Sequence, residues 1–228
     1  MLGRLGLAAG AAWLGYAWVA HLATPFCVHK APRDAGRRVA LTFDDGPDPT
    51  WTPRIVDALA EHGVRGTFFL VGERAVRAPE AVRAIVAGGH EVASHGWSHR
   101  SLWLCGPRRT ADEIDRAQEA LTTLSGTTPR FFRPAWGMVN AAMFPLLRAR
   151  HVRAVFWSIQ PEGLRPAPAE TQAAYVVARA HPGAIVDLHD AEGTPGAPER
   201  LLAALPAMID GLRAADYAFA TVGELLAE

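Results

Sequence analysis

The sequence has few of the residues that mark several common classes of protein. Only two of its 228 residues are cysteines, Cys27 and Cys105, which form neither a disulfide framework nor a pair at metal-ligand spacing. Lysine plus arginine and aspartate plus glutamate each number 23, and no long basic run occurs. This balance argues against a nucleic-acid-binding protein. The length and the apolar half of the composition instead suit one ordinary folded domain.

Charged residues are also missing from Leu5 to Val28. As a helix, this stretch would be long enough to cross a hydrocarbon core of about 30 Å. Trp13, Tyr16 and Trp18 add rings of the kind that sit at membrane interfaces. We therefore expect residues 1–28 to form a transmembrane anchor, with a cleaved signal peptide or a buried core helix as the alternatives. Residues 29–37 would then be a linker to a domain at 38–228.

The remaining chain alternates between strand-like and helix-like patterns. Strands are expected at 38–43, 66–71, 90–94, 130–132, 153–159, 184–188 and 217–222. Helices are expected at 52–61, 79–87, 110–124, 141–149, 169–180 and 198–214. This alternation predicts an α/β fold of parallel strands covered by helices, either a barrel or an open doubly wound sheet.

Unusual polar and aromatic residues follow four of the expected strands. They are Asp44 and Asp45 after the first, His95 and His99 after the third, Arg133 and Trp136 after the fourth, and His189 at the end of the sixth. In barrels and open parallel sheets alike, active sites form where strands end, so these segments should converge on one rim.

Two of these groups of residues suggest a cation site. Adjacent carboxylates such as Asp44 and Asp45 repel each other unless a cation or a donor compensates. His95 and His99 are separated by three residues, so both imidazoles can reach one ion. Two histidines and one carboxylate leave room for water, which fits a catalytic ion better than a structural one.

In this order, the motifs TFDDGP, SHGWSH, RPAWG and DLHD resemble those of the polysaccharide deacetylase family, the NodB-homology domain of the family-four carbohydrate esterases. The resemblance runs from about Val39 to Leu226. It implies a distorted seven-stranded (β/α) barrel that hydrolyses N-acetyl groups of chitin-like glycans or peptidoglycan. It also implies one divalent metal, which we expect to be Zn²⁺, with Co²⁺, Fe²⁺ and Ni²⁺ as alternatives.

The resemblance gives the two adjacent carboxylates different roles. Asp45, His95 and His99 would bind the metal, whereas Asp44 would remain free as the general base.

The same resemblance assigns three further roles. Arg133 would hold the base ionised and oriented. The backbone N–H of Trp136 would stabilise the oxyanion, and His189 would be the general acid that protonates the leaving amine.

Three of the motifs depart from the family pattern. Gly96 stands where a hydroxyl residue is usual, and Gly163 with Leu164 replaces an Asp-Trp pair. Asp187 stands where the family has leucine. We expect Asp187 to replace the missing carboxylate by orienting His189 and raising its pKa, with a rim salt bridge as the alternative. Leu164 and Leu188 would supply apolar contacts to the substrate.

Two alternatives to a glycan deacetylase stay open. One is a deacylase or deformylase of a lipid-linked sugar, and the other is an inactive glycan-binding domain. Basic residues after the apolar segment would keep the domain cytoplasmic by the positive-inside rule. Because cell-wall glycans lie outside and the rule weakens for large domains, we expect a cell-membrane protein with an extracytoplasmic domain. The sequence leaves the oligomeric state open.

Overall fold

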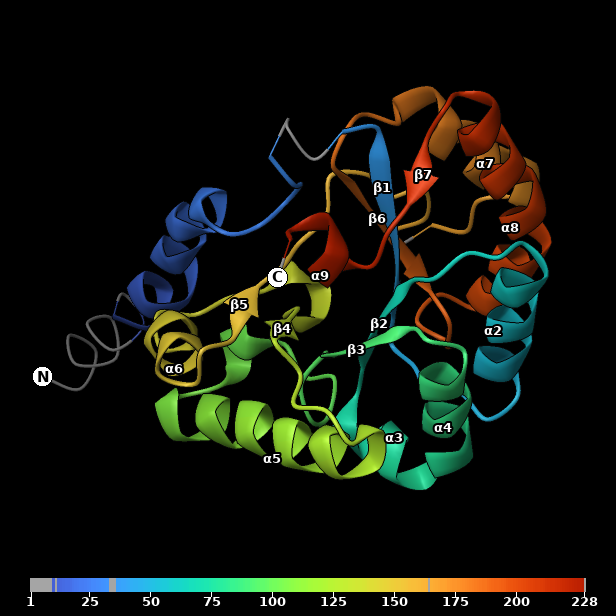
Figure 1. The fold of residues 1–228 in the computed structure, drawn as a ribbon. Coiled ribbons are helices and arrows are strands. Elements are labelled where there is room, and N and C mark those ends of the chain that lie inside the picture. Colours follow the sequence, from blue (N-terminus) through green and yellow to red (C-terminus); the bar gives the residue numbers. More distant parts are fainter. Residues whose placement is uncertain (1–9, 11, 33–35, 164, 228) are drawn as a thin grey trace, which may run out of the picture.

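The structure is a computed structural model that describes residues 10, 12–32, 36–163 and 165–227. Its centre is a sheet of seven strands, all paired in parallel, that curls so that most of the helices lie outside it (Figure 1). The strands are β1 (Arg38–Asp44), β2 (Thr67–Leu70), β3 (Glu91–Ser94), β4 (Phe131–Phe132), β5 (Arg153–Ala154), β6 (Ala184–His189) and β7 (Ala218–Phe219). The seven expected strands are confirmed, and the curled parallel sheet is consistent with a (β/α) barrel.

The strand order is β5-β4-β3-β2-β1-β6, with β7 paired to the beginning of β1. After β5 the chain returns to β6 through a bridge between Ile159 and Val186, which brings the two ends of the sheet order together. Val28 bridges Val155, and Lys30 bridges Ala184. The stretch that we expected to be a linker therefore begins as a pairing segment at this edge of the sheet.

The helices outside the sheet are α2 (Trp51–Glu61), α3 (Gly72–Arg77), α4 (Pro79–Ala87), α5 (Pro107–Ser125), α6 (Met143–Ala149), α7 (Ala169–Arg179) and α8 (Ala197–Ala214). The short α9 (Val222–Leu225) instead packs with inner-face residues such as Ala40 and Phe69. Proline in the first turn of α4, α5 and α8 suits helix starts, because an N–H there has no partner within the helix. All six expected helices are present. The short α3 and α9 were not predicted from the sequence.

The two faces of β1 explain how the sheet positions polar groups. Val39, Leu41 and Phe43 belong to the large hydrophobic cluster that includes residues of α2 and α8. Side chains alternate along a strand, so Thr42 and Asp44 point the other way, toward the inside of the curl. The register of β1 with β6 then pairs Thr42 with Asp187 and Asp44 with His189. Four polar residues thus lie beside one another on the inner face.

The N-terminal segment differs from the expected transmembrane anchor. Residues 12–18 are α-helical, but a 3₁₀ helix, η1 (Val19–Phe26), follows them. In the described ranges no helix is long and apolar enough to cross a membrane. The segment lies beside α6 (Figure 1), and Ala141 N–H donates to the carbonyl of Tyr16 at 3.0 Å. The apolar composition indicated one long helix. Contacts with the domain instead determine the conformation and path of this segment. Residues 1–9 lie outside the described part.

Candidate active site

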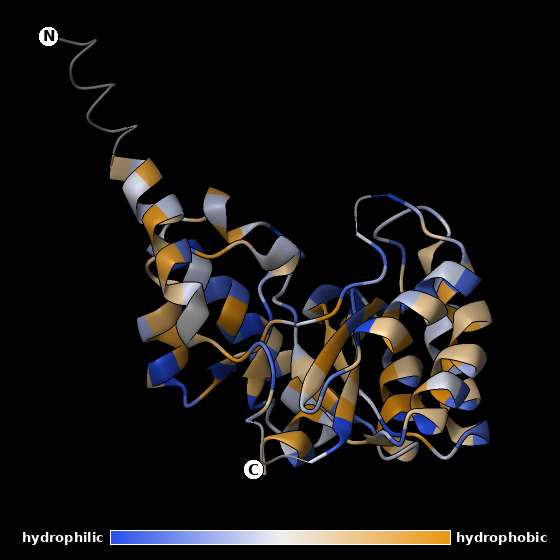
Figure 2. Cartoon of the chain, turned by 90° about the horizontal axis from the view of Figure 1, so that it is seen from above, coloured by the Kyte–Doolittle hydropathy of each residue, from blue (hydrophilic) through white to orange (hydrophobic). Residues whose placement is uncertain are grey.

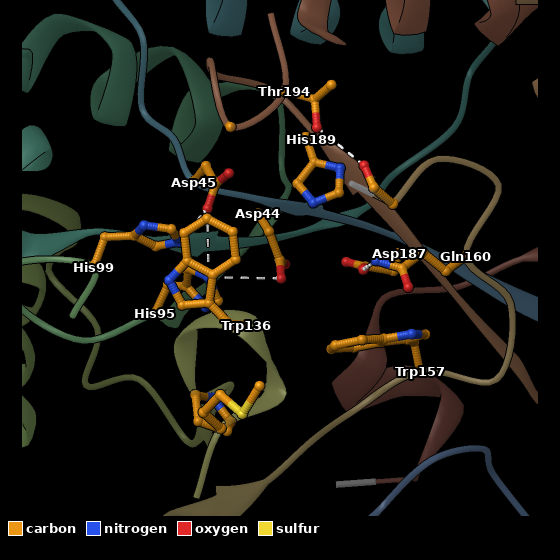
Figure 3. Close-up of a pocket in the computed structure, with 14 residues that line it drawn as sticks. Asp44, Asp45, His95, His99, Trp136, Trp157, Gln160, Asp187, His189 and Thr194 are labelled. Atoms are coloured by element: carbon orange, nitrogen blue, oxygen red, sulfur yellow. Dashed lines mark hydrogen bonds and ion pairs between the residues drawn. The ribbon is translucent and has the colours of Figure 1, made fainter. Parts of the chain in front are cut away.

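Except for Arg133, which is buried behind it, the polar residues singled out in the sequence meet in one pocket at the carboxyl ends of the strands (Figure 3). Its cavity measures about 260 Å³. Among its lining residues are Asp44, Asp45, His95, His99, Trp136, Asp187 and His189. The side chains of Asp44 and Asp45 both reach it, although they are adjacent in the chain, because Asp45 has a left-handed backbone with φ 73° just after β1 ends.

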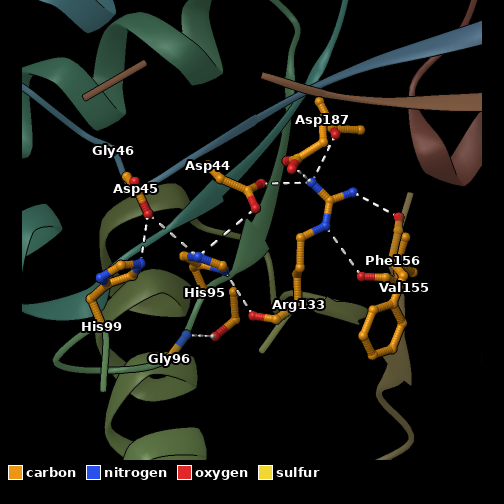
Figure 4. A network of polar contacts seen from close by, with 12 residues as sticks. Asp44, Asp45, Gly46, His95, Gly96, His99, Arg133, Val155, Phe156 and Asp187 are labelled. Atoms are coloured by element: carbon orange, nitrogen blue, oxygen red, sulfur yellow. Dashed lines mark hydrogen bonds and ion pairs between the residues drawn. The ribbon is translucent and has the colours of Figure 1, made fainter. Parts of the chain in front are cut away.

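Asp45, His95 and His99 form a compact cluster that fits a metal ion. Their ligand atoms all lie within 4.8 Å of one another. Asp45 Oδ1 is 2.7 Å from His99 Nε2 and 3.5 Å from His95 Nε2 (Figure 4). His95 Nδ1 lies 2.8 Å from the carbonyl oxygen of Arg133. A proton on Nδ1 would satisfy that carbonyl and leave the Nε2 lone pair facing the cluster, as a metal ligand requires.

Charges within the cluster are strongly coupled. Burial by itself raises the pKa of Asp45, but hydrogen bonds and charge from His95 and His99 bring it below its ordinary value. Burial lowers the pKa of His95, but the carboxylates of Asp44 and Asp45 raise it above its ordinary value. The carboxylates of the site therefore stabilise a positive charge placed between them, and a divalent cation would supply such a charge.

The turn after β1 is fixed by a fully buried carboxylate, Asp190. It accepts the backbone N–H of Gly46 at 3.2 Å and the hydroxyl of Thr52 at 2.5 Å. A Cβ at Gly46 would meet Asp190 at 2.2 Å, so the close approach requires glycine. From the other side, Arg74 donates to the carbonyl of Asp45 at 2.6 Å. These contacts hold the backbone that carries Asp44 and Asp45.

The loop that carries His95 and His99 is held by a carboxylate from α5. Glu113 accepts the backbone N–H groups of Trp97 and Ser98 at 3.1 and 2.8 Å, and the Ser98 hydroxyl at 2.7 Å. Gly96 has φ +85°, a conformation that favours glycine over the serine or threonine usual in the family. Glu113 therefore braces this loop without a hydroxyl at position 96.

Arg133 is fully buried and links the base candidate to the sheet (Figure 4). Its Nη1 is 2.7 Å from Asp44 Oδ1 and 2.8 Å from the Thr42 hydroxyl. Nε and Nη2 donate to the carbonyls of Val155 and Phe156 at 3.2 and 2.9 Å. The guanidinium is thus fixed by several acceptors, and one oxygen of Asp44 is held by it.

Asp187 takes a different partner from the one expected. Its Oδ1 is 3.2 Å from Arg133 Nη1, and its Oδ2 accepts a hydrogen bond of 3.0 Å from Gln160. Burial and the charge of Asp44 raise the pKa of Asp187 well above its ordinary value, although Arg133 opposes them. Within the described residues, the imidazole of His189 makes no hydrogen bond to Asp187. Both side chains occupy the inner face, but the carboxylate points toward Arg133.

The other predicted site residues are placed as follows. His189 ends β6 and lines the pocket, and Trp136 stands half exposed with its ring centroid 5.2 Å from that of His99. Leu188 is not at the pocket. It is buried in the core cluster with residues of α7 and α8, because side-chain alternation turns it away from Asp187 and His189. The expected contact from Leu164 lies outside the described residues.

Sequence reasoning missed several residues of this site. Trp157 and Gln160 line the pocket, as does Gly193, where a Cβ would meet Asp45 at 2.3 Å. Trp157 supplies an aromatic wall from the same segment that lacks the family's tryptophan. Asp190 stands inside the DLHD motif, so its position beside His189 was an available signal. Glu113 lies on a helix surface in the sequence pattern, and only its burial reveals its role.

Comparison with known proteins agrees with this geometry. A peptidoglycan-N-acetylglucosamine deacetylase of Bacillus cereus is 33% identical over 81% of this chain and 64% of its own length. The chain thus spans less than two thirds of that relative. A chitooligosaccharide deacetylase of Bradyrhizobium is 38% identical over 72% of this chain and 74% of its own.

A solved family 4 acetyl xylan esterase from Clostridium thermocellum, in complex with a cobalt ion, has a TM-score of 0.73 and 33% identity. The similarity covers 83% of this chain and 90% of that one. The model of the polysaccharide deacetylase family matches residues 31–155, more than half of the chain. The chain therefore belongs to the polysaccharide deacetylase family.

Proposed function

We propose that this protein is a metal-dependent deacetylase that hydrolyses N-acetyl groups of a glycan containing N-acetylglucosamine, such as peptidoglycan or a chitin-like chain. One observation carries the proposal. The Asp45, His95 and His99 cluster faces a second carboxylate, Asp44, which is bonded to Arg133 and takes no part in the cluster. A site with a metal ligand set and a separate base suits hydrolysis of an unreactive amide.

A divalent cation held by the three ligands would acidify a water molecule and polarise the acetamide carbonyl. Asp44 is placed to accept the proton of that water, because its Oδ2 lies 3.8 Å from His95 Nε2 while Arg133 holds its other oxygen. The cluster suits several borderline ions, of which we expect Zn²⁺ first.

Two further groups complete the proposed reaction. The backbone N–H of Trp136 would donate to the developing oxyanion at the mouth of the pocket. His189 would protonate the departing amine of the sugar. Since none of the described side chains hydrogen-bonds to its imidazole, the ring is available to the substrate in the pocket.

The substrate class and the location are proposed together. Relatives named for peptidoglycan and for chitooligosaccharides support a cell-wall or chitin-like glycan. We place the domain outside the cytoplasmic membrane, where such polymers are found. A lipid-linked sugar is the alternative substrate, and it would be favoured by a cytoplasmic domain. Protease added to intact spheroplasts separates the two locations, because only an external domain would be cut.

The central experiment follows acetate and free amine released by the full chain from chitooligosaccharides and from peptidoglycan, with and without a chelator. Chelator-sensitive release from one of them would support the proposal and identify the substrate class. Release that a chelator does not affect would contradict metal dependence. Retention of metal with no release from either glycan would favour the lipid-linked sugar or an inactive glycan-binding domain.

A further inference from the structure

The N-terminal segment presents an exposed apolar face. Leu14, Trp18 and Leu22 recur at intervals of four residues and are 64, 62 and 69% exposed. We call these three side chains, together with Trp13, Val19 and the neighbouring Leu104 of η3 (Leu102–Leu104), the N-terminal ridge. The ridge holds six of the nine large hydrophobic side chains exposed on the described part of the protein. Concentration of exposed apolar groups in one place indicates an interaction surface.

Contacts with the domain fix which face of the segment is exposed. Ala17 and Ala20 are buried against the domain, and Ala20 belongs to the core cluster around α6. Trp103 Nε1 donates to His21 Nε2 at 2.7 Å, and Trp13 Nε1 donates to the Trp103 carbonyl at 3.1 Å. Since one face is packed against the domain, the ridge side chains are held on the outside. Figure 2 shows the segment at the edge of the molecule, on the side of the N label.

We propose that the N-terminal ridge lies in the plane of an anionic lipid bilayer, with the domain resting on the membrane surface. Three features of the chain favour lipid over a protein partner. The ridge has no charged side chain, and the uncharged run to which it belongs begins before the described helix, at Leu5. Its two tryptophans are the residues that bilayer interfaces accept best.

The third feature is positive charge close to Leu104 in the sequence. Arg100, Arg108 and Arg109 flank Leu104 in sequence and are exposed. Arg109 forms an ion pair with Glu113 but keeps 44% of its side chain exposed. Exposed cations that flank an apolar residue of the ridge in the chain suit the boundary between acyl chains and anionic headgroups. The expected depth is shallow, because a segment that bonds sideways to the domain cannot also cross the bilayer.

This geometry links the membrane to the pocket. The loop after β4 carries Trp136 and Met138 at the pocket and, three residues later, Ala141, whose N–H bonds to Tyr16 in the N-terminal segment. The ridge and one wall of the pocket therefore share a short connection. Membrane docking would hold the pocket near glycan strands at the membrane surface. The docking itself does not depend on the proposed deacetylase activity.

The test is flotation of the full chain with vesicles of phosphatidylcholine and phosphatidylglycerol. Trp18→Glu with Leu22→Glu should lower the bound fraction about tenfold or more, because two apolar contacts are lost and charge is added. Val76→Glu with Val86→Glu, at exposed valines of α3 and α4, is the matched control and should bind as the natural protein does. Equal binding by both double variants, or no binding by the natural chain, would overturn the proposal.

Two further measurements separate other occupants of the ridge. Lipids brominated near the headgroup should quench tryptophan fluorescence more than lipids brominated at the chain end, and the reverse order would indicate deep insertion and contradict docking in the plane. A dimer in solution that Trp18→Glu dissociates would assign the ridge to a second copy. Circular dichroism establishes that the variants fold. Hydrolysis of soluble chitooligosaccharides should be unchanged in both variants, so loss of activity and loss of docking are distinguishable.

Discussion

The pocket and the N-terminal ridge depart from ordinary burial in opposite directions. In the pocket, Arg133, Asp44 and Asp187 are charged groups with at most 3% of their surface exposed. On the ridge, Trp18 and Leu22 are large apolar groups with more than half of theirs exposed. Buried polar groups and contiguous exposed apolar groups are the informative exceptions in a folded protein.

The two regions differ in whether the domain itself supplies partners for the unusual side chains. Each buried charge of the pocket has partners within the domain, such as the carbonyl of Val155 for Arg133 and the amide of Gln160 for Asp187. The ridge has no comparable cover in the described residues. A mutation within the domain can thus disrupt the internal network of the pocket. The ridge side chains should instead change their environment when lipid vesicles are added.

The largest expected effect is on catalysis. His95→Ala or His99→Ala should abolish tight metal binding and turnover, because either change removes one of three ligands. Asp44→Asn should retain the metal and lower turnover by about 10²- to 10⁴-fold, the range of general base catalysis. Metal content and acetate release are the measurements. Loss of the ion from Asp44→Asn would show that the two aspartates do not divide their roles as proposed.

Removal of Arg133 should have the next largest effect, on stability. Arg133→Met would leave two buried carboxylates without their guanidinium, and breaking a buried pair costs about 3–5 kcal/mol of unfolding free energy. Arg150→Met is the matched control. Its partner Asp115 is half exposed, so the loss should be about 0–1 kcal/mol. Urea unfolding of the metal-free proteins measures both. If the two variants lose similar amounts of unfolding free energy, the buried ion pairs of Arg133 do not stabilise the pocket as proposed.

A pH dependence is expected from Asp190. Burial, followed by the nearby charges of Asp45 and Asp44, raises its pKa to about 7 against an ordinary 3.8. Between about pH 4 and pH 7 the folded chain therefore holds a proton that the unfolded chain has released. The resulting stabilisation of the folded state is complete below about pH 4 and is lost as the pH rises to about 7. The loss is at most about 4 kcal/mol.

Asp190→Asn should flatten this part of the stability curve of the metal-free protein. Its unfolding free energy, measured by urea titration at pH 5 and pH 8, should change less with pH than that of the natural chain. Asp115→Asn, at an exposed position, should retain the natural dependence. If Asp190→Asn keeps the full dependence on pH, other buried groups of the pocket are responsible for it.

The smallest predicted effect separates two roles for Asp187. If Asp187 acts through Arg133, Asp187→Leu should lower kcat about tenfold and leave KM and metal affinity unchanged, because Asp44 loses support on one side only. Asp187→Asn should restore most of kcat, since its amide oxygen still accepts from Arg133. The original prediction, in which Asp187 orients His189, instead requires Asp187→Asn to shift the alkaline limb of the rate profile to lower pH.

The strands, the outer helices and the meeting of four motifs could be predicted from the sequence. Strand and helix periods are local properties, and the rule that active sites form at the carboxyl ends of parallel strands needs only the order of the elements. Asp44, Asp45, His95 and His99 were therefore expected at one rim, where the structure places them.

Partners of individual side chains were decided by the tertiary structure. Register between β1 and β6 places Asp187 opposite Thr42, and the chain brings Arg133 to it after β4 and Gln160 after β5. Leu188 lies in the core because the strand alternates. The N-terminal segment shows the same limit most clearly, since its apolar sequence is compatible with a membrane span, a surface ridge or a buried helix. Only packing of Ala17 and Ala20 against the domain fixed which face remained exposed, because burial depends on neighbours that are distant in the sequence.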